Sequence, residues 1–204
     1  WKPKKGEPRV LPIYQSTTFK YDTTEEMGRL FALEEDGYFY SRLQNPTREQ
    51  LEKVVASLEN GIDAIAFSTG MAAITMMMEL FKPGDHLIVD SDLYGGSIRL
   101  FHNVSAKNGI EFSSVDCYKE DVESFVKENT KAIYIETPTN PMMNVTDIAA
   151  MAEIARRHDL LLIVDNTFAT PINCRPFEWG ADIVTHSTTK YMDGHGAVLG
   201  GAIV

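Results

Sequence analysis

From residue 62 onward, short apolar runs alternate with segments of helical periodicity, and this alternation limits the fold more than any other feature of the sequence. The predicted strands cover residues 63–67, 86–90, 111–115, 131–135, 160–164 and 182–185. The predicted helices between them cover residues 71–80, 96–107, 119–128 and 147–158. Neither long linkers nor internal repeats interrupt the pattern, so it predicts an α/β fold with a mostly parallel sheet. Several runs are apolar at every position, which is typical of strands with both faces covered.

The last predicted strand, 182–185, is followed by Ser187, Thr189 and Lys190. A lysine directly after a buried strand is unusual, because an ammonium group taken out of water must be paired, neutralised or chemically modified. A lone Ser-x-Thr-Lys is most often part of a surface loop. The alternative is a Schiff-base lysine whose neighbouring hydroxyl groups bind the phosphate of pyridoxal 5′-phosphate (PLP). That hypothesis requires other strands to end in a carboxylate, a phosphate-binding turn and an aromatic ring.

A phosphate-binding turn and an aromatic ring follow the first two predicted strands. The strand at 63–67 runs into Thr69, Gly70 and Met71 at the start of a helix. Free N–H groups at a helix N-terminus favour a phosphate, and Gly70 lets the backbone approach it closely. Glycine is common in such turns, so this signal is weak by itself. Tyr94 follows the next strand and is either a half-buried packing residue or a ring that stacks on a pyridine and exchanges protons.

An amide and a carboxylate follow two of the later strands. Asn140 comes after the strand at 131–135 and either caps a turn or donates to the cofactor's 3′-oxygen. Asp165 ends the run at 160–164, where a free anion would be costly, so it needs a cationic partner. A protonated pyridine nitrogen meets that need. Ligands of open α/β sheets bind beyond the carboxyl ends of the strands, which is where these residues fall.

Composition excludes several other classes of function. The 204 residues carry a formal charge of −10, which argues against a nucleic acid or an anionic membrane as partner. No run has the length of a transmembrane helix and the N-terminus lacks a signal-peptide core, so a cytoplasmic location is expected. The two cysteines and five histidines lack metal-site spacing, so we expect reduced thiols and no metal. Dinucleotide and nucleoside-triphosphate motifs are also absent.

Residues 1–20 contain three prolines and no helical period, which predicts an extended arm that lies on a neighbouring domain or subunit. Tyr40 and Arg42 follow, and they are either surface residues or a pair of anion contacts. We therefore assign residues 1–45 to an N-terminal extended arm and helix, and 46–204 to a PLP-binding large domain. The sequence lacks an initiator methionine and ends in the opening of a further strand, so we expect a truncated part of a longer polypeptide.

Taken together, these residues resemble the Cys/Met-metabolism family of PLP-dependent enzymes. That family includes cystathionine γ-synthase, cystathionine lyases, methionine γ-lyase and O-acetylhomoserine sulfhydrylase. The resemblance runs from Tyr14 to Val204 and is highly specific when its motifs are combined. The shared motifs are Tyr40-Ser-Arg42, Thr69-Gly-Met71, Tyr94-Gly-Gly, Glu136-Thr-Pro-Thr-Asn140-Pro, Val164-Asp165-Asn-Thr and Ser187-Thr-Thr-Lys190-Tyr.

The resemblance implies a role for each matching residue. Lys190 would carry PLP, Asp165 would pair with the ring nitrogen, and Tyr94 would stack on the ring. The Gly70 and Met71 turn would hold the phosphate. It would act together with Ser187 and Thr189 and with Tyr40 and Arg42 of the adjacent subunit.

The resemblance also implies PLP fold type I, whose large domain is an αβα sandwich, and a homodimer or homotetramer with shared active sites. A smaller C-terminal domain would not be present in this chain. The implied function is elimination or replacement at Cγ or Cβ of a sulfur-containing or homoserine-derived amino acid, with Lys190 and Tyr94 as catalytic residues. An O-acetylhomoserine sulfhydrylase, a methionine γ-lyase, a different PLP chemistry and a non-catalytic fragment remain open. Cysteine often stands at the position of Gly96 in methionine γ-lyases, which weighs against that choice.

Overall fold

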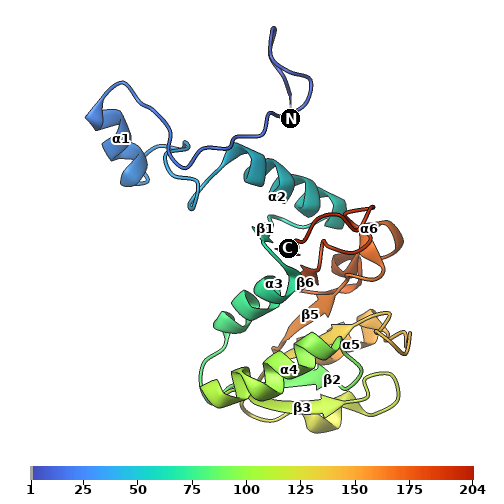
Figure 1. The fold of residues 1–204 in the computed structure, drawn as a ribbon. Helices are drawn as coiled ribbons and strands as arrows, with labels where there is room; N and C mark the ends of the chain where they lie inside the picture. Colours follow the sequence, from blue (N-terminus) through green and yellow to red (C-terminus); the bar gives the residue numbers. More distant parts are fainter. Residues whose placement is uncertain (1) are drawn as a thin grey trace. The chain divides into compact units, whose positions relative to one another are not determined.

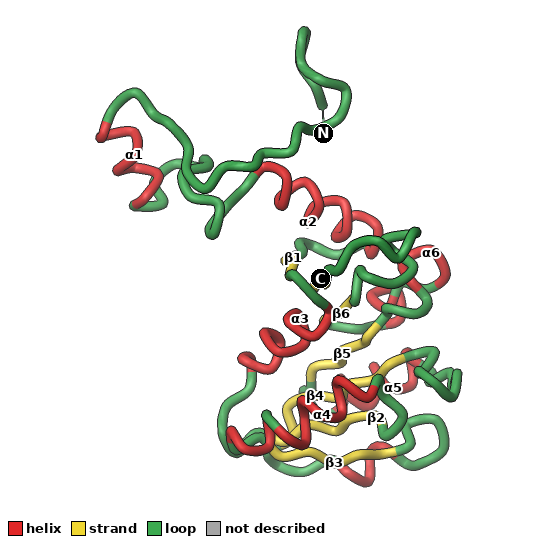
Figure 2. The backbone as a smooth tube through the Cα atoms, viewed as in Figure 1, coloured by secondary structure: helices red, strands yellow, loops and turns green. Residues whose placement is uncertain are grey.

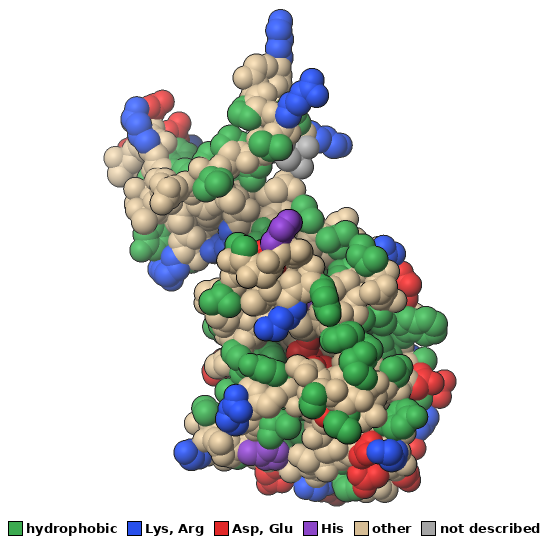
Figure 3. All heavy atoms as spheres, turned by 45° about the vertical axis from the view of Figure 1, so that its right-hand side comes forward, with side chains coloured by type: hydrophobic (Ala, Val, Ile, Leu, Met, Phe, Trp, Pro, Cys, Tyr) green, Lys and Arg blue, Asp and Glu red, His purple; other side chains and the backbone are tan. Residues whose placement is uncertain are grey.

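The computed structural model describes residues 2–204, which form two compact units, one up to Val54 and one from Val55 to Val204. Within the described residues, no helix has the length and apolar character needed to cross a membrane. Acidic and basic side chains both occur on the face shown in Figure 3.

The first unit contains the predicted arm and a short capped helix. Residues 2–23 include no helix, and Thr18 pairs with Tyr40 in an antiparallel bridge. Helix α1 (Thr24–Phe31) begins with a capping box. In it the Thr23 hydroxyl accepts from the Glu26 N–H, and the Glu26 carboxylate accepts from the Thr23 N–H. Helix α2 (Pro46–Glu59) begins here and ends in the second unit.

The second unit is built on a seven-stranded sheet with the order β1-β7-β6-β5-β4-β2-β3. Strands β2 to β6 are parallel, whereas β7 runs antiparallel to both β1 and β6. All six predicted strands are confirmed, and the strand expected at the C-terminal end is β7. The strands are β1 (Ile65–Phe67), β2 (His86–Asp90), β3 (Glu111–Val115), β4 (Thr130–Glu136), β5 (Leu161–Asp165), β6 (Ile183–His186) and β7 (Gly201–Ile203).

Helices connect the strands, and three of the four predicted ones are confirmed. The α-helices of this unit, besides the end of α2, are α3 (Gly70–Met77), α4 (Gly95–Asn103), α5 (Ile148–Arg157) and α6 (Thr170–Asn173). Short 3₁₀ helices cover Met78–Leu80, Ser105–Asn108, Val122–Phe125 and Pro176–Trp179.

The predicted helix at 119–128 is wrong, because only the single 3₁₀ turn Val122–Phe125 forms there. Val126 follows it in an extended conformation, with φ −69° and ψ 129°. The connection must carry the chain back along the sheet from the end of β3 to the start of β4. Extended residues cover about 3.3 Å each against about 1.5 Å in a helix, so a short connection gains reach by staying extended. Valine and aspartate in this segment also have low helix propensity.

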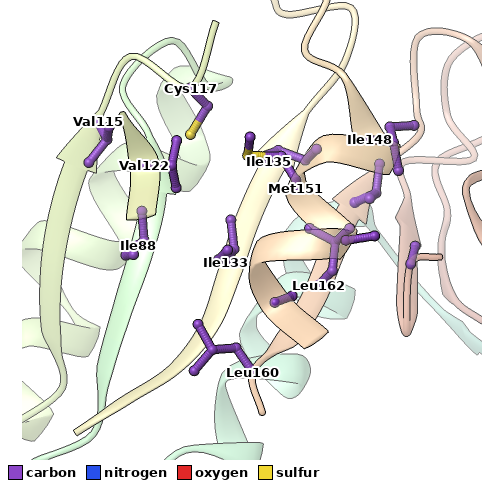
Figure 4. Packing of buried hydrophobic residues seen from close by; sticks show 14 of the residues in the cluster. Ile88, Val115, Cys117, Val122, Ile133, Ile135, Ile148, Met151, Leu160 and Leu162 are labelled. Carbon is purple, nitrogen blue, oxygen red and sulfur yellow. The ribbon is translucent and has the colours of Figure 1, made fainter. Parts of the chain in front are cut away.

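Two apolar layers cover the two faces of the sheet, because successive side chains of a strand point to opposite faces. Helix α5 covers one face, where Ile133 and Leu162 pack with Met151 (Figure 4). Helices α3 and α4 cover the other, where Leu87 and Tyr134 are fully buried (Figures 1 and 2). The sheet is thus closed on both sides, which leaves the carboxyl ends of its strands as the place where polar side chains collect.

Candidate active site

A pocket opens at the carboxyl ends of the strands of the second unit. Its walls come from the start of α3, the turns that follow β2, β4 and β5, and the segment after β6. The structure brings together nine of the eleven predicted site residues here. The lining residues are Thr69, Gly70, Met71, Ile74, Tyr94, Glu136, Asn140, Asp165, Thr167, Ser187, Thr189, Lys190 and Leu199.

The turn from β1 into α3 forms the first wall. The Thr69 hydroxyl accepts a hydrogen bond from the Ala72 N–H at 3.0 Å, so it caps the helix. A Cβ at Gly70 would lie 2.6 Å from Cβ and 2.8 Å from Cα of Ser187. Only glycine therefore allows α3 to start this close to the segment after β6. The free N–H groups of α3 and the Ser187 hydroxyl meet here, which is an arrangement suited to an anion.

Asp165 forms the floor of the pocket at the end of β5, with only 6% of its surface exposed. Its carboxylate accepts hydrogen bonds from the Thr167 N–H at 3.0 Å and from the Tyr134 hydroxyl at 3.3 Å. Burial raises the pKa of Asp165, whereas hydrogen bonds from Thr167 and then the charge of His186 act in the opposite direction. Among the described residues, no lysine or arginine forms an ion pair with this carboxylate. The pocket therefore suits a ligand that brings a positive charge to Asp165.

Glu136 lies beside Asp165, because the two residues are paired in register on β4 and β5. Its carboxylate accepts the Tyr94 N–H at 2.6 Å, which fixes the backbone that carries the predicted aromatic ring. Burial first, and the charge of Asp165 second, raise the pKa of Glu136 to about 8. Glu136 is therefore largely protonated at neutral pH, and the pocket avoids two adjacent anions.

Asp92 joins the turns that carry Tyr94 and Asn140. Its carboxylate accepts from the Thr139 hydroxyl at 2.5 Å and from the Asn144 side chain at 3.1 Å. This connection holds the turn after β4 against the turn after β2 and places Asn140 and Tyr94 on the same pocket. The Tyr94 side chain stays 43% exposed, so its ring is available to a ligand.

The segment after β6 forms the last wall. Lys190 lines the pocket but is exposed, so it is not the buried ammonium that its position after an apolar strand suggested. The Thr189 hydroxyl donates to the Gly200 carbonyl at 3.2 Å and accepts from the Gly200 N–H at 3.1 Å. The Ser187 N–H donates to the Thr167 hydroxyl at 2.8 Å.

Tyr40 and Arg42, the remaining two predicted residues, belong to the first unit. The Arg42 guanidinium carbon lies 5.4 Å from the centroid of the Tyr40 ring, within the range of a cation–π contact. The Ser41 N–H donates to the Thr17 carbonyl at 2.9 Å, so the arm holds this segment in place.

Sequence reasoning missed three residues that contact the predicted ones. Glu136 is the last residue of β4, as Asp165 is the last residue of β5. The argument that a carboxylate at the end of an apolar run is costly would therefore also have identified Glu136. Thr167 could have been suspected from its place two residues after Asp165. Tyr134 had no such signal, because a tyrosine inside an apolar run reads as a core residue.

Comparison with known proteins decides the family. The family model for Cys/Met metabolism PLP-dependent enzymes matches residues 2–204. This chain belongs to that family. A cystathionine gamma-synthase/O-acetylhomoserine (thiol)-lyase from Bacillus subtilis (strain 168) is 51% identical, over 95% of this chain and 50% of the relative. An L-methionine gamma-lyase from Fusobacterium nucleatum subsp. nucleatum is 46% identical, over 96% of this chain and 50% of the relative.

Solved structures agree with this family assignment. The crystal structure of cystathionine gamma-lyase from Lactobacillus plantarum, complexed with L-serine, has a TM-score of 0.87 and 45% identity, and the match covers 95% of this chain and 49% of that one. That of metB from Corynebacterium glutamicum has a TM-score of 0.93 and 42% identity, over 100% of this chain and 52% of that one. The chain spans about half the length of the curated relatives it matches. The expected fold type I large domain is confirmed, and pyridoxal 5′-phosphate is the cofactor of the family.

The described pocket fits that cofactor on two structural grounds. The Gly70 turn leaves room for a phosphate at the N-terminus of α3, since a side chain there would collide with Ser187. Asp165 is a buried carboxylate with only neutral hydrogen-bond donors in contact, so a protonated pyridine nitrogen would supply the missing charge.

We predict that Glu136→Gln changes the pH dependence of stability of the full-length protein without cofactor. The folded-state pKa of Glu136, about 8, lies above the usual value near 4.5, so the stabilisation is present at low pH and is lost as pH rises towards 8. The parental free energy of unfolding in urea should therefore fall more steeply from pH 5 to 8 than that of the variant. The exposed Glu128→Gln serves as control. Parallel curves for the parent and Glu136→Gln would contradict this account of the Glu136 pKa.

Proposed function

We propose that the full-length protein is a PLP-dependent enzyme of the transsulfuration type. It would eliminate or replace a group at Cγ or Cβ of a sulfur-containing or homoserine-derived amino acid. The observation that carries the proposal is that Asp165 and Lys190 line one pocket at the ends of the neighbouring strands β5 and β6. The names of the relatives, which include cystathionine gamma-synthase, cystathionine gamma-lyase and cystathionine beta-lyase, support the same reaction class.

The pocket residues would divide between cofactor binding and proton transfer. When bound, the cofactor supplies an electron sink for negative charge on the substrate carbon atoms. Asp165 would hold the proton on the ring nitrogen, and Asn140 would donate to the 3′-oxygen. The phosphate would lie against Thr69, Gly70, Met71, Ser187 and Thr189.

Lys190 and Tyr94 would be the catalytic residues. The Lys190 amine would attach the cofactor covalently at rest and would move protons at the substrate Cα and Cβ once released. The exposed Tyr94 phenol would exchange a proton with the substrate amine or the leaving group. General acid–base steps of this kind each contribute about 10²–10⁴-fold.

Two narrower assignments follow from the names of the relatives. One is an O-acetylhomoserine (thiol)-lyase and the other a methionine γ-lyase. A Cβ at Gly96 would lie 2.4 Å from the Tyr94 ring, so a larger residue there would displace that ring. Because Gly96 and Tyr94 lie this close, we expect the residue at position 96 to affect which substrate the pocket prefers.

Because both cysteines are free thiols, we also propose a cytoplasmic location.

We predict that Lys190→Ala abolishes both covalent PLP attachment and turnover in the full-length protein, while the exposed Lys107→Ala changes neither. The amine is the only part of the side chain that the proposed chemistry needs. Borohydride reduction followed by peptide mass spectrometry locates the attachment. Product analysis with cystathionine, methionine and O-acetylhomoserine identifies the reaction. Attachment at a different lysine would contradict the assignment, and a parental protein that binds PLP without turning over any of the three would support a non-catalytic role.

We further propose a homodimer or homotetramer with shared active sites. Leu51, Val54 and Leu58 form an apolar stripe on α2 and are 51%, 44% and 38% exposed. An exposed stripe of this kind is typical of a surface that a partner covers. Tyr40 and Arg42 precede the same helix, and they would contact the phosphate in the pocket of the adjacent subunit.

We predict that Arg42→Ala and Lys190→Ala chains of the full-length protein complement each other in heterodimers. Each homodimer should be nearly inactive, whereas a tagged heterodimer should hold one site with an intact Lys190 and an intact Arg42 from the other chain. The control is a heterodimer of Lys190→Ala and Asp165→Asn, which should not recover because both residues line the same pocket. Activity of the first heterodimer no higher than that of its homodimers would rule out the shared site.

A further inference from the structure

The guanidinium group of Arg48 binds the backbone of the segment that carries Tyr40 and Arg42. Its Nη1 donates to the Ser41 carbonyl at 3.1 Å and to the Arg42 carbonyl at 3.2 Å. Its Nη2 donates to the Leu43 carbonyl. All five residues belong to the first unit. One side chain on α2 therefore holds three successive carbonyl groups of this segment.

The three carbonyl groups lie at the open end of a single helical turn. The Leu43 and Gln44 N–H groups donate to the Tyr40 carbonyl at 2.9 Å and 3.1 Å, which closes the turn. The last carbonyl groups of a helical turn have no partner within the turn itself. A guanidinium group has five N–H donors in a fixed planar arrangement, so it can satisfy several of these carbonyl groups at once. A lysine ammonium is a flexible point charge and would hold the turn less firmly.

Helix stability alone does not account for an arginine at this position. Arg48 is the third residue of α2, in the first turn of the helix. The N-terminus of a helix carries a partial positive charge, which disfavours a cation there. Glu52, one turn further along, offsets this repulsion through an ion pair with Arg48 Nε at 3.4 Å. The contacts that favour arginine here are therefore those with the carbonyl groups.

The arm holds the same segment from its other side. Asn45 Nδ2 donates to the Ser41 hydroxyl and to the Tyr14 carbonyl, both at 3.0 Å. The Arg42 side chain nevertheless remains exposed, in contact with the Tyr40 ring. Within residues 2–204, no carboxylate forms an ion pair with Arg42. The backbone of Arg42 is thus fixed, whereas its guanidinium group is available to an anion.

We propose that Arg48 is a positioning residue, which fixes the backbone of Arg42 so that the Arg42 guanidinium group is preorganised for the cofactor phosphate of the adjacent subunit. The inference rests on the proposed shared active site. Arg48 would not touch the cofactor. Ordering a flexible side chain and its backbone during binding lowers affinity, and a backbone that is already fixed reduces this loss.

The first test is the PLP affinity of the full-length protein, measured by titrating the cofactor-free form and following the absorbance of bound PLP. We predict that Arg48→Lys, which keeps the charge but loses the planar donors, weakens this affinity about tenfold, the order expected for one lost hydrogen bond to a charged group. In an Arg42→Ala background the same substitution should have little further effect, because Arg48 acts through Arg42. The matched control is Arg29→Lys, whose guanidinium group donates to Glu35 at 2.6 Å in the same unit and should not affect PLP affinity.

Tagged heterodimers show which active site Arg48 serves. When one chain carries Lys190→Ala, only the other chain can attach PLP covalently, and borohydride trapping at increasing PLP concentrations measures the affinity of that site. We predict that Arg48→Lys weakens trapping when it is placed on the chain without Lys190. On the chain that retains Lys190 it should leave trapping unchanged.

The outcomes separate this inference from the proposed function. If Arg42→Ala weakens PLP affinity but Arg48→Lys does not, Arg48 is not a positioning residue and the shared site stands. An equal effect of Arg48→Lys with and without Arg42, or a lowered melting temperature with unchanged affinity, shows a purely structural role and overturns the inference. If Arg48→Lys does not fold, Arg48→Gln decides by the same measurements. If Arg42→Ala itself leaves PLP affinity unchanged, the shared site is contradicted and the inference fails with it.

Discussion

The pocket depends on a buried carboxylate that has no lysine or arginine partner among the residues that the structure describes. Asp165 is 6% exposed, and the donors in contact with it, the Thr167 N–H and the Tyr134 hydroxyl, are neutral. Taking an anion out of water is costly unless a positive charge compensates. The neutral donors of the chain stabilise the Asp165 carboxylate only in part. A ligand with a positive charge would supply the rest of that stabilisation.

The parallel sheet places the remaining groups around that carboxylate. Register pairs Glu136 with Asp165 and Asp165 with Thr185, so neighbouring strands end at the same level. The strands then continue into turns, and hydrogen bonds join neighbouring turns. The Thr167 hydroxyl accepts from the Ser187 N–H, which joins the turn after β5 to the segment after β6. The pocket is thus a consequence of sheet geometry and of a few hydrogen bonds between adjacent turns.

The sequence predicted what depends on local pattern. The apolar runs of the sequence predicted all the strands. The polar residues that follow these runs predicted most of the pocket, because a buried strand ends where its apolar run ends. The predicted helix at 119–128 was wrong because the conformation of that connection depends on the distance between the end of β3 and the start of β4. A local sequence pattern does not contain that distance. The exposure of Lys190 was missed for a related reason, since it depends on the path of the segment after β6. The contact between Glu59 and His186 joins residues 127 positions apart and could only be seen in three dimensions.

We propose that this pocket holds PLP with its ring nitrogen on Asp165 and its aldehyde carbon on Lys190. The most direct measurement is a crystal structure of the full-length protein grown with PLP. The account predicts electron density continuous with Lys190 Nζ, the ring nitrogen within hydrogen-bond distance of Asp165, and the phosphate at the N-terminus of α3 beside Ser187. Density for the cofactor elsewhere, or in this pocket with its ring nitrogen away from Asp165, would contradict it.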